Sequence, residues 1–256
     1  MVRFATLMLV SGGFALLNGA AALADDSSKQ QSMLDPAGPQ AQHASDLYYI
    51  IMVPALLVLF IVCGMIIYAA VRFRRRSDDE MPRQVGGNNA LEFTWTLIPA
   101  MILMGIFVLT LFQMPFLRDA PASASSAMHV TVSGRQWAWS FAYPNVKTVK
   151  AQLKVKAADA EYTTLTNDLV IPAGQVVNLD IRSEDVIHSW SVPRLSGRLD
   201  AIPGQVNHTW IQADAPGAYY GQCTEFCGLS HATMTVRVLA LTPEDWNAWY
   251  AQQPRQ

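Results

Sequence analysis

The sequence has few cysteines and few charges, and each shortage excludes a class of protein. Only three of the 256 residues are cysteine, too few for a disulfide-rich secreted scaffold. Charged residues make up 15% of the chain and the formal net charge is −2, which argues against a nucleic-acid-binding protein. No Cys-x-x-Cys-His motif occurs, so the chain has no attachment site for a c-type haem. No internal repeat is visible, and the length allows one large or two small domains.

Two long stretches in the first half lack charge altogether and are rich in apolar residues. Residues 47–71 and 93–112 are each long enough to span a hydrocarbon core of about 30 Å as a helix. Pro99 is tolerated in such a span where neighbours satisfy the freed carbonyl. By the positive-inside rule, the basic loop between the stretches lies in the cytoplasm and both chain ends lie outside. We therefore predict a transmembrane helical hairpin over residues 47–116. The arginines of the loop are Arg72, Arg74, Arg75, Arg76 and Arg83.

The first 24 residues have the layout of an export signal. Arg3 precedes an apolar run, and Ala22-Leu23-Ala24 stands before two aspartates as an A-x-A cleavage site. The alternative is a short first membrane helix, which the glycines and polar residues at 11–13 and 18 weaken. Residues 25–46 are polar and show no periodicity. We predict a signal peptide over 1–24 and a periplasmic N-terminal tail over 25–46.

The second half predicts an all-β domain. After a Pro/Ala/Ser linker at 117–127, short β-branched and aromatic runs alternate with turns such as Pro203-Gly204 and Pro216-Gly217, a spacing typical of a sandwich or barrel. Thr242 fits an N-cap followed by proline and two acidic residues, which predicts a short C-terminal helix. The predicted strands are 129–133, 136–143, 169–171, 176–181, 189–192, 206–211, 218–220 and 235–239.

The most informative segment lies between Tyr220 and Thr235 and reads Gly-Gln-Cys-Thr-Glu-Phe-Cys-Gly-Leu-Ser-His-Ala-Thr-Met. Two thiols, an imidazole and a thioether are soft ligands, which favours copper over hard cations. A disulfide across three intervening residues would close a tight, strained ring. A zinc site is chemically possible but has no need of a methionine. The candidate ligands are Cys223, Cys227, His231 and Met234, with His188 upstream.

This segment resembles the binuclear copper (CuA) loop of the cytochrome c oxidase subunit II family, C-x-E-x-C-G-x-x-H-x-x-M. Residues 185–193 (Asp-Val-Ile-His-Ser-Trp-Ser-Val-Pro) and 198–204 (Arg-Leu-Asp-Ala-Ile-Pro-Gly) resemble that family's other copper segment, and the resemblance runs from about Leu47 to about Leu239. It implies a cupredoxin-like Greek-key domain over residues 128–256. It also implies a multi-pass protein of the bacterial inner (plasma) membrane, with the copper domain in the periplasm.

The resemblance assigns roles to the loop residues. Cys223 and Cys227 would bridge two copper ions, His188 and His231 would each bind one, and Met234 would be a weak ligand. The backbone carbonyl of Glu225 would also bind copper, and its carboxylate would hold a magnesium ion shared with subunit I. A solvated surface carboxylate is the alternative for this side chain. Electrons would pass from cytochrome c to the haem of subunit I, where oxygen is reduced to water with proton pumping; subunit III is a further expected partner.

Three residues outside the loop also match the family. Trp137 begins an aromatic segment in which the first tryptophan accepts electrons from cytochrome c, although the period-two pattern also fits one face of a core strand. Glu92 lies in an E-x-x-W-T-x-x-P segment whose glutamate takes up protons, with an interfacial anchor as the alternative. Asp200 matches a position implicated in docking, and acidic residues near the ligands would speed association with a basic cytochrome c.

Other functions share parts of this pattern. Subunit II of a quinol oxidase has the hairpin and the β domain but lacks the copper ligands. A membrane-anchored copper carrier would give Glu92 and Trp137 no purpose. The copper domain of nitrous-oxide reductase does not suit a double-span anchor. Copper analysis together with a haem-bearing partner would select the oxidase.

Overall fold

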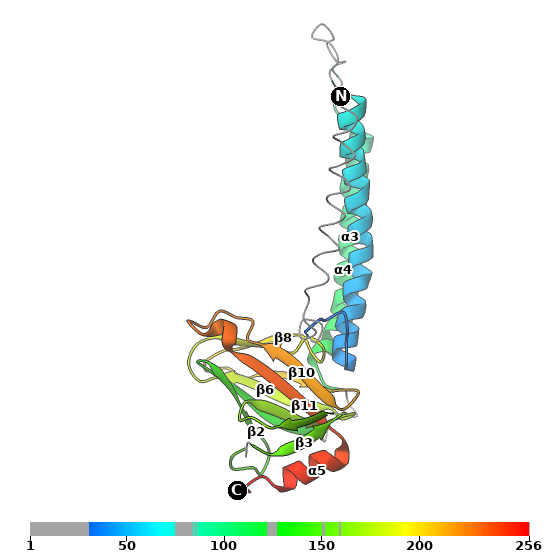
Figure 1. Cartoon of the computed structure of the whole chain (residues 1–256). Helices are drawn as coiled ribbons and strands as arrows, with labels where there is room; N and C mark the ends of the chain where they lie inside the picture. The colour runs from blue at the N-terminus through cyan, green and yellow to red at the C-terminus, as the bar shows by residue number, and fades with distance from the viewer. Residues whose placement is uncertain are drawn as a thin grey trace, which may run out of the picture. The chain divides into compact units, whose positions relative to one another are not determined.

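The computed structural model describes residues 31–74, 84, 86–121, 127–149, 152–158 and 160–255. The predicted signal peptide lies outside these residues, as do parts of the predicted cytoplasmic loop and linker. The chain divides into two compact units (Figure 1). We call the described residues of His43–Arg118 the helical unit; the β unit comprises the described residues up to Gln42 and those from Asp119 onward.

Two long apolar helices form the helical unit. Helix α3 spans Pro39–Arg72 and helix α4 spans Asn89–Arg118, so each contains one predicted span and extends beyond it at both ends. Both helices are long and apolar enough to cross a membrane. The ring of His43 lies 3.6 Å from the ring of Phe116, so the start of α3 meets the end of α4 as in an antiparallel hairpin. Pro54, Pro99 and Pro115 lie within these helices.

The β unit contains two main sheets. One has the strand order β2-β1-β6-β9 and the other β10-β11-β5, while β3-β4 and β7-β8 form two-stranded ribbons. The pairs β1-β6 and β5-β11 are parallel and all other pairs are antiparallel. The eight predicted strands are present; β3, β4 and β8 were not predicted. The bounds are β1 Met128–Arg135, β2 Ala138–Ala142, β3 Lys154–Ala157, β4 Ala160–Thr163, β5 Asp168–Pro172, β6 Val177–Ser183, β7 His188–Ser191, β8 Arg198–Ala201, β9 Asn207–Ile211, β10 Gly217–Gln222 and β11 Thr235–Leu241.

One hydrophobic core is shared by both main sheets. Because successive strand residues point to opposite faces, β6 buries Val177, Leu179 and Ile181 and turns Asn178 and Asp180 outward. Side chains of β5 and β11 enter the same buried cluster from the other sheet. The β unit is therefore a sandwich, as the strand spacing predicts.

The C-terminal helix α5, Pro243–Ala251, closes the chain as predicted. The hydroxyl of Thr242 accepts a hydrogen bond from the backbone N–H of Asp245, and a proline occupies the first turn. Trp249 is buried and packs edge-on against Tyr143, at 5.4 Å between ring centroids. The Tyr143 hydroxyl donates to Val170 O and accepts from Val170 N, which ties the end of β2 to β5.

The residues just before α3 pack into the β unit. The backbone N–H of Ala37 donates to Arg194 O at 2.8 Å, and Ala37 O accepts from Asp214 N at 2.9 Å. The Asp35 carboxylate pairs with Arg194 at 3.1 Å. The described part of the predicted tail is thus a packed segment, followed by the first turns of α3 from Pro39.

Candidate metal centre

The predicted copper ligands come from two segments of the β unit. His188 is the first residue of β7, and Cys223 follows β10 directly. Cys227, His231 and Met234 belong to the connection between β10 and β11, which includes the short 3-10 helix η3, His231–Thr233. We call residues 223–234 the ligand loop.

Backbone hydrogen bonds hold the ligand loop closed and against β7. At the base of the loop, Cys223 N donates to Met234 O at 2.9 Å. One residue further on, Thr224 N donates to Ser189 O in β7 at 3.0 Å. Since Ser189 follows His188, this contact brings the imidazole and the first thiol to the same place.

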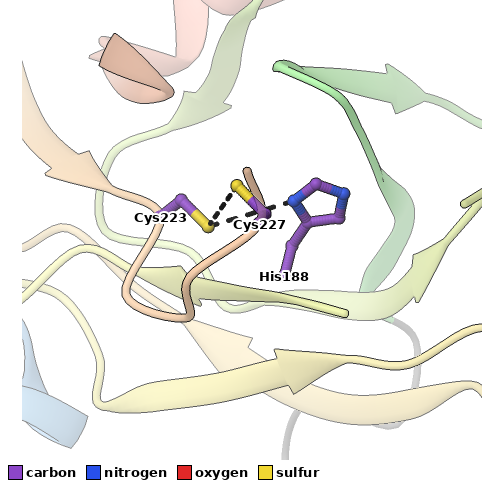
Figure 2. A group of neighbouring side chains, drawn as sticks. All are labelled: His188, Cys223 and Cys227. Carbon is purple, nitrogen blue, oxygen red and sulfur yellow. Dashed lines mark hydrogen bonds between the residues drawn. The ribbon is translucent and has the colours of Figure 1, made fainter. Parts of the chain in front are cut away.

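Three side chains converge there, as Figure 2 shows. The ligand atoms of His188, Cys223 and Cys227 all lie within 4.8 Å of one another, and all three residues are buried. Cys223 Sγ lies 3.8 Å from Cys227 Sγ and 4.0 Å from His188 Nδ1. The cysteines are free, and their sulfur separation is far beyond the roughly 2.05 Å of a disulfide bond. The group can therefore hold a metal ion.

The Cys227 thiol has two further candidate metal ligands close to it. Cys227 Sγ lies 3.5 Å from His231 Nδ1 and 3.8 Å from Met234 Sδ. The carbonyl oxygen of Glu225 lies 3.2 Å from Cys223 Sγ, so the backbone between the cysteines also points towards the sulfurs. The arrangement is a pair of thiols with one imidazole beside each, because His188 lies near Cys223 and His231 near Cys227.

Asp185 orients the buried imidazole. Its Oδ1 lies 2.8 Å from His188 Nε2, which leaves Nδ1 directed at the thiols. A carboxylate on the far nitrogen fixes the tautomer and ring orientation of a metal-binding histidine. Burial alone would raise the pKa of Asp185, but hydrogen bonds from Gln136 N, His188 and Val186 N outweigh it and lower the pKa below its usual value.

At the second thiol no set of hydrogen bonds outweighs burial, so the net pKa shift is upward. Burial and, after it, the neighbouring Cys223 raise the pKa of Cys227 to about 11. This thiol therefore holds its proton more tightly than an exposed cysteine does.

Strand β1 leaves room for the His188 ring. A Cβ on Gly134 would lie 3.0 Å from His188 Cδ2 and 3.1 Å from the Trp139 ring. Trp139 is buried and meets His188 and Trp190 edge-on, at centroid distances of 6.0 and 5.5 Å. The imidazole is thus packed against buried aromatic side chains.

Known proteins match this chain over both of its units. The family description "Cytochrome C oxidase subunit II, periplasmic domain" matches residues 128–241, and "Cytochrome C oxidase subunit II, transmembrane domain" matches residues 26–113. The cytochrome c oxidase subunit 2 of Zea mays is 31% identical over 235 residues, which cover 88% of this chain and 89% of that protein. The chain belongs to the cytochrome c oxidase subunit II family.

Two further relatives show how far the similarity extends. The cytochrome c oxidase subunit 2 of Alkalihalophilus pseudofirmus is 36% identical over 220 residues, covering 84% of this chain but only 60% of that relative. The crystal structure of the periplasmic domain of subunit II of cytochrome oxidase from Bradyrhizobium japonicum is 32% identical, with a TM-score of 0.41. The matched region covers 49% of this chain and 92% of the Bradyrhizobium japonicum domain.

These comparisons confirm the family predicted from the ligand loop. They also agree with the predicted fold class, a pair of apolar helices followed by a β-sandwich domain with a short C-terminal helix. The match to the family's transmembrane domain and the two apolar helices make the chain a membrane-anchored protein.

Trp137 lies in the turn between β1 and β2, beside the ligand loop. It is 37% exposed, whereas Trp139 and Phe141 of the same aromatic segment are buried. Its indole Nε1 donates to Cys227 O at 3.2 Å. The core-strand alternative therefore describes the later aromatic residues and not Trp137.

Glu92 has a structural partner that the sequence analysis missed. Its Oε1 accepts a hydrogen bond from Asn88 N at 3.1 Å, and the Asn88 side chain accepts one from Leu91 N at 3.1 Å. This reciprocal cap satisfies free N–H groups at the start of α4, where a negative charge is also favourable. Its sequence signal is the asparagine followed four residues later by glutamate.

Asp200 and Glu225 share one arginine. Arg198 Nη2 lies 2.6 Å from Glu225 Oε2 and 3.5 Å from Asp200 Oδ1. Asp200 lies on β8, which pairs with β7 and so runs beside the His188 segment. The structure places the predicted docking residue and the predicted magnesium ligand in one exposed ion-pair cluster.

Proposed function

We propose that this chain is the electron-input subunit of a haem-copper cytochrome c oxidase. It would take electrons from cytochrome c and deliver them to the haem of subunit I. Reduction of oxygen to water and proton pumping would belong to the assembled complex, with subunit III as a further partner. The observation that carries this proposal is the buried pair of thiols 3.8 Å apart with a different imidazole beside each.

The donor set fits two copper ions better than one zinc ion. A structural zinc site gathers four ligands around one point, whereas His231 is not in the group whose ligand atoms all lie within 4.8 Å of one another. Thiols and a thioether also favour copper. Cys223 and Cys227 would bridge the ions, His188 and His231 would each bind one, and Met234 and the Glu225 carbonyl would be weak ligands. Once bound, the ions would supply one-electron transfer with little change in ligand geometry.

The surface around the ligands supports docking of a protein partner. Several apolar side chains are exposed in and near the ligand loop, including Phe226 at 78% and Leu229 at 94%. Trp137 lies at this surface and is hydrogen-bonded to Cys227 O, so we assign to it the acceptance of electrons from cytochrome c. Asp200, which lies on β8, would attract a basic cytochrome c.

The remaining assignments concern the membrane and the partner subunits. The α3–α4 loop would lie in the cytoplasm, and the β unit in the periplasm of a bacterium, after removal of residues 1–24. Glu92 would take up protons at the cytoplasmic end of α4 in addition to capping the helix. The Glu225 carboxylate would exchange Arg198 for a magnesium ion at the border with subunit I.

The full-length chain, purified in detergent after loading with copper, tests this proposal. We expect two copper ions per chain and an EPR signal from one electron shared by two nuclei. Cys223→Ser should abolish both, whereas Cys63→Ser in α3 should change neither and is the matched control. A chain that binds one zinc ion and no copper would contradict the proposal.

Co-purification separates the related functions. Copper together with a haem-bearing partner selects the oxidase. Copper without such a partner selects a membrane-anchored carrier, and a haem-bearing partner without copper selects a quinol oxidase.

A further inference from the structure

The turn between β1 and β2 connects the two segments that carry the ligands. Gln136 N donates to Asp185 Oδ2 at 2.8 Å, and the other oxygen of this carboxylate lies 2.8 Å from His188 Nε2. The Gln136 side-chain amide donates to Cys227 O at 2.7 Å. One residue is therefore tied to the histidine side of the centre through its backbone and to the cysteine side through its side chain.

We propose that Gln136 is a positioning residue that sets the geometry and the retention of the copper centre. Its side-chain amide holds the Cys227 carbonyl, and its backbone N–H holds the carboxylate that orients His188. The inference rests on the proposed copper function, and it assigns to Gln136 a role within the centre rather than only at its surface.

The Cys227 carbonyl is held by two donors at once. Gln136 Nε2 lies 2.7 Å and Trp137 Nε1 3.2 Å from the oxygen, which uses both of its lone pairs. Fixing this carbonyl fixes the peptide plane that follows Cys227, and with it the direction of the Cys227 side chain. Of the two donors, the Gln136 amide is the closer, and it belongs to the residue whose backbone N–H also holds Asp185.

Gly228 permits this contact. Its φ of 119° lies in a region that residues with a side chain rarely adopt. A Cβ at this position would lie 3.0 Å from Gln136 Nε2 and 3.3 Å from the Trp137 ring. The ligand loop therefore has a glycine where the turn between β1 and β2 packs against it.

This connection is solvent-accessible, unlike the ligands it holds. Gln136 and Trp137 are both exposed, whereas His188, Cys223 and Cys227 are buried. The same two side chains that would meet a docking partner thus hold a backbone atom of a copper ligand. Retention of copper should depend on an amide at the surface, which a purely structural role in the turn would not produce.

Gln136→Met in the full-length, copper-loaded chain tests the inference, because methionine has a similar length and no N–H donor. We expect two copper ions to bind, with an altered copper hyperfine splitting in the EPR spectrum. Loss of copper to an excess of chelator should be about tenfold faster, since losing a group that orients a ligand typically costs 10- to 100-fold in metal affinity. Gln205→Met is the matched control. Gln205 is also exposed, and its side-chain amide donates a hydrogen bond to Asn207 Oδ1.

Trp137→Phe provides a second, milder variant, since it removes the longer of the two hydrogen bonds to the same carbonyl. It should shift the EPR spectrum in the same direction and by less. Unchanged spectra and unchanged copper loss in both variants would overturn the role of Gln136 while leaving the copper function intact. A parent chain that binds no copper would instead contradict the proposed function, and the inference with it.

Discussion

The helical unit exposes its apolar side chains, whereas the β unit buries them. No residue of α4 is buried, while Leu179 and Ile181 in β6 are fully enclosed. In a bilayer each spanning segment must satisfy its backbone hydrogen bonds internally, so composition along one stretch is enough to define a helix. In the β unit, strands are defined by partners far away in the sequence. Local sequence therefore determines the first unit, and long-range pairing determines the second.

The substitution with the largest expected effect destabilises the β unit and leaves the helical unit unchanged. Leu179→Ala should lower the free energy of unfolding of the β unit by about 2–5 kcal/mol, because it leaves a cavity in a closed core. Leu103→Ala in α4 makes the same chemical change at a side chain that is 66% exposed, and should alter that free energy by less than about 0.5 kcal/mol. Urea unfolding of the full chain in detergent, followed by near-UV circular dichroism, measures both. Equal losses would contradict the comparison.

The same contrast explains which elements could be predicted. The two spans are visible as uncharged runs, but their ends are not, because residues 39–46 are polar and α3 still begins at Pro39, where a proline suits the first helical position. The strands of the two sheets show as β-branched and aromatic runs. Strand β8, Arg198–Ala201, carries no such signal and exists because it pairs with β7. The ribbon of β3 and β4 is largely exposed. It was not predicted either, because each of its strands is held by pairing with the other.

The candidate site divides in the same way. Its thiols, His231 and the thioether could be predicted because they lie close together in one loop with a recognisable spacing. The contacts of Gln136 could not, since its partners Asp185 and Cys227 lie 49 and 91 residues away in the sequence. Asp185 stands three residues before His188, a short-range signal that could have marked it as the residue that orients the imidazole.

A smaller effect tests the polar end of an otherwise apolar helix. Glu92→Gln keeps an acceptor for Asn88 N but removes the titrating proton, so it should preserve the start of α4. In the assembled oxidase, turnover should fall if the carboxylate passes protons. Copper content and the rate of electron uptake from cytochrome c should not change. Oxygen consumption and stopped-flow reduction measure these quantities.

Two further substitutions separate capping from proton uptake at Glu92. Glu92→Asp should restore part of the activity, because it retains a titrating carboxylate. Glu92→Ala should lose the activity and also weaken the helix start by about 1 kcal/mol, the usual cost of a lost cap. Normal turnover in an assembled Glu92→Gln enzyme would leave capping as the role of this side chain.

The smallest effect concerns a single exposed charge of the β unit. Asp200 is 42% exposed at its side chain and lies 3.5 Å from Arg198, so its charge is partly balanced within the chain. Asp200→Asn should weaken association with a basic cytochrome c by about 0.2–1 kcal/mol, at most roughly fivefold.

Glu161→Gln removes the same charge from β4, where the carboxylate pairs with Lys154 at 2.9 Å, and is the matched control. Binding measured at rising salt distinguishes a local contact from net charge, because exposed charges are screened beyond about 8 Å at physiological ionic strength. The Asp200→Asn effect should shrink with salt, and Glu161→Gln should have little effect throughout. Equal losses in both variants would mean that the partner responds to the total charge of the β unit, and that Asp200 has no special place beside the ligand loop.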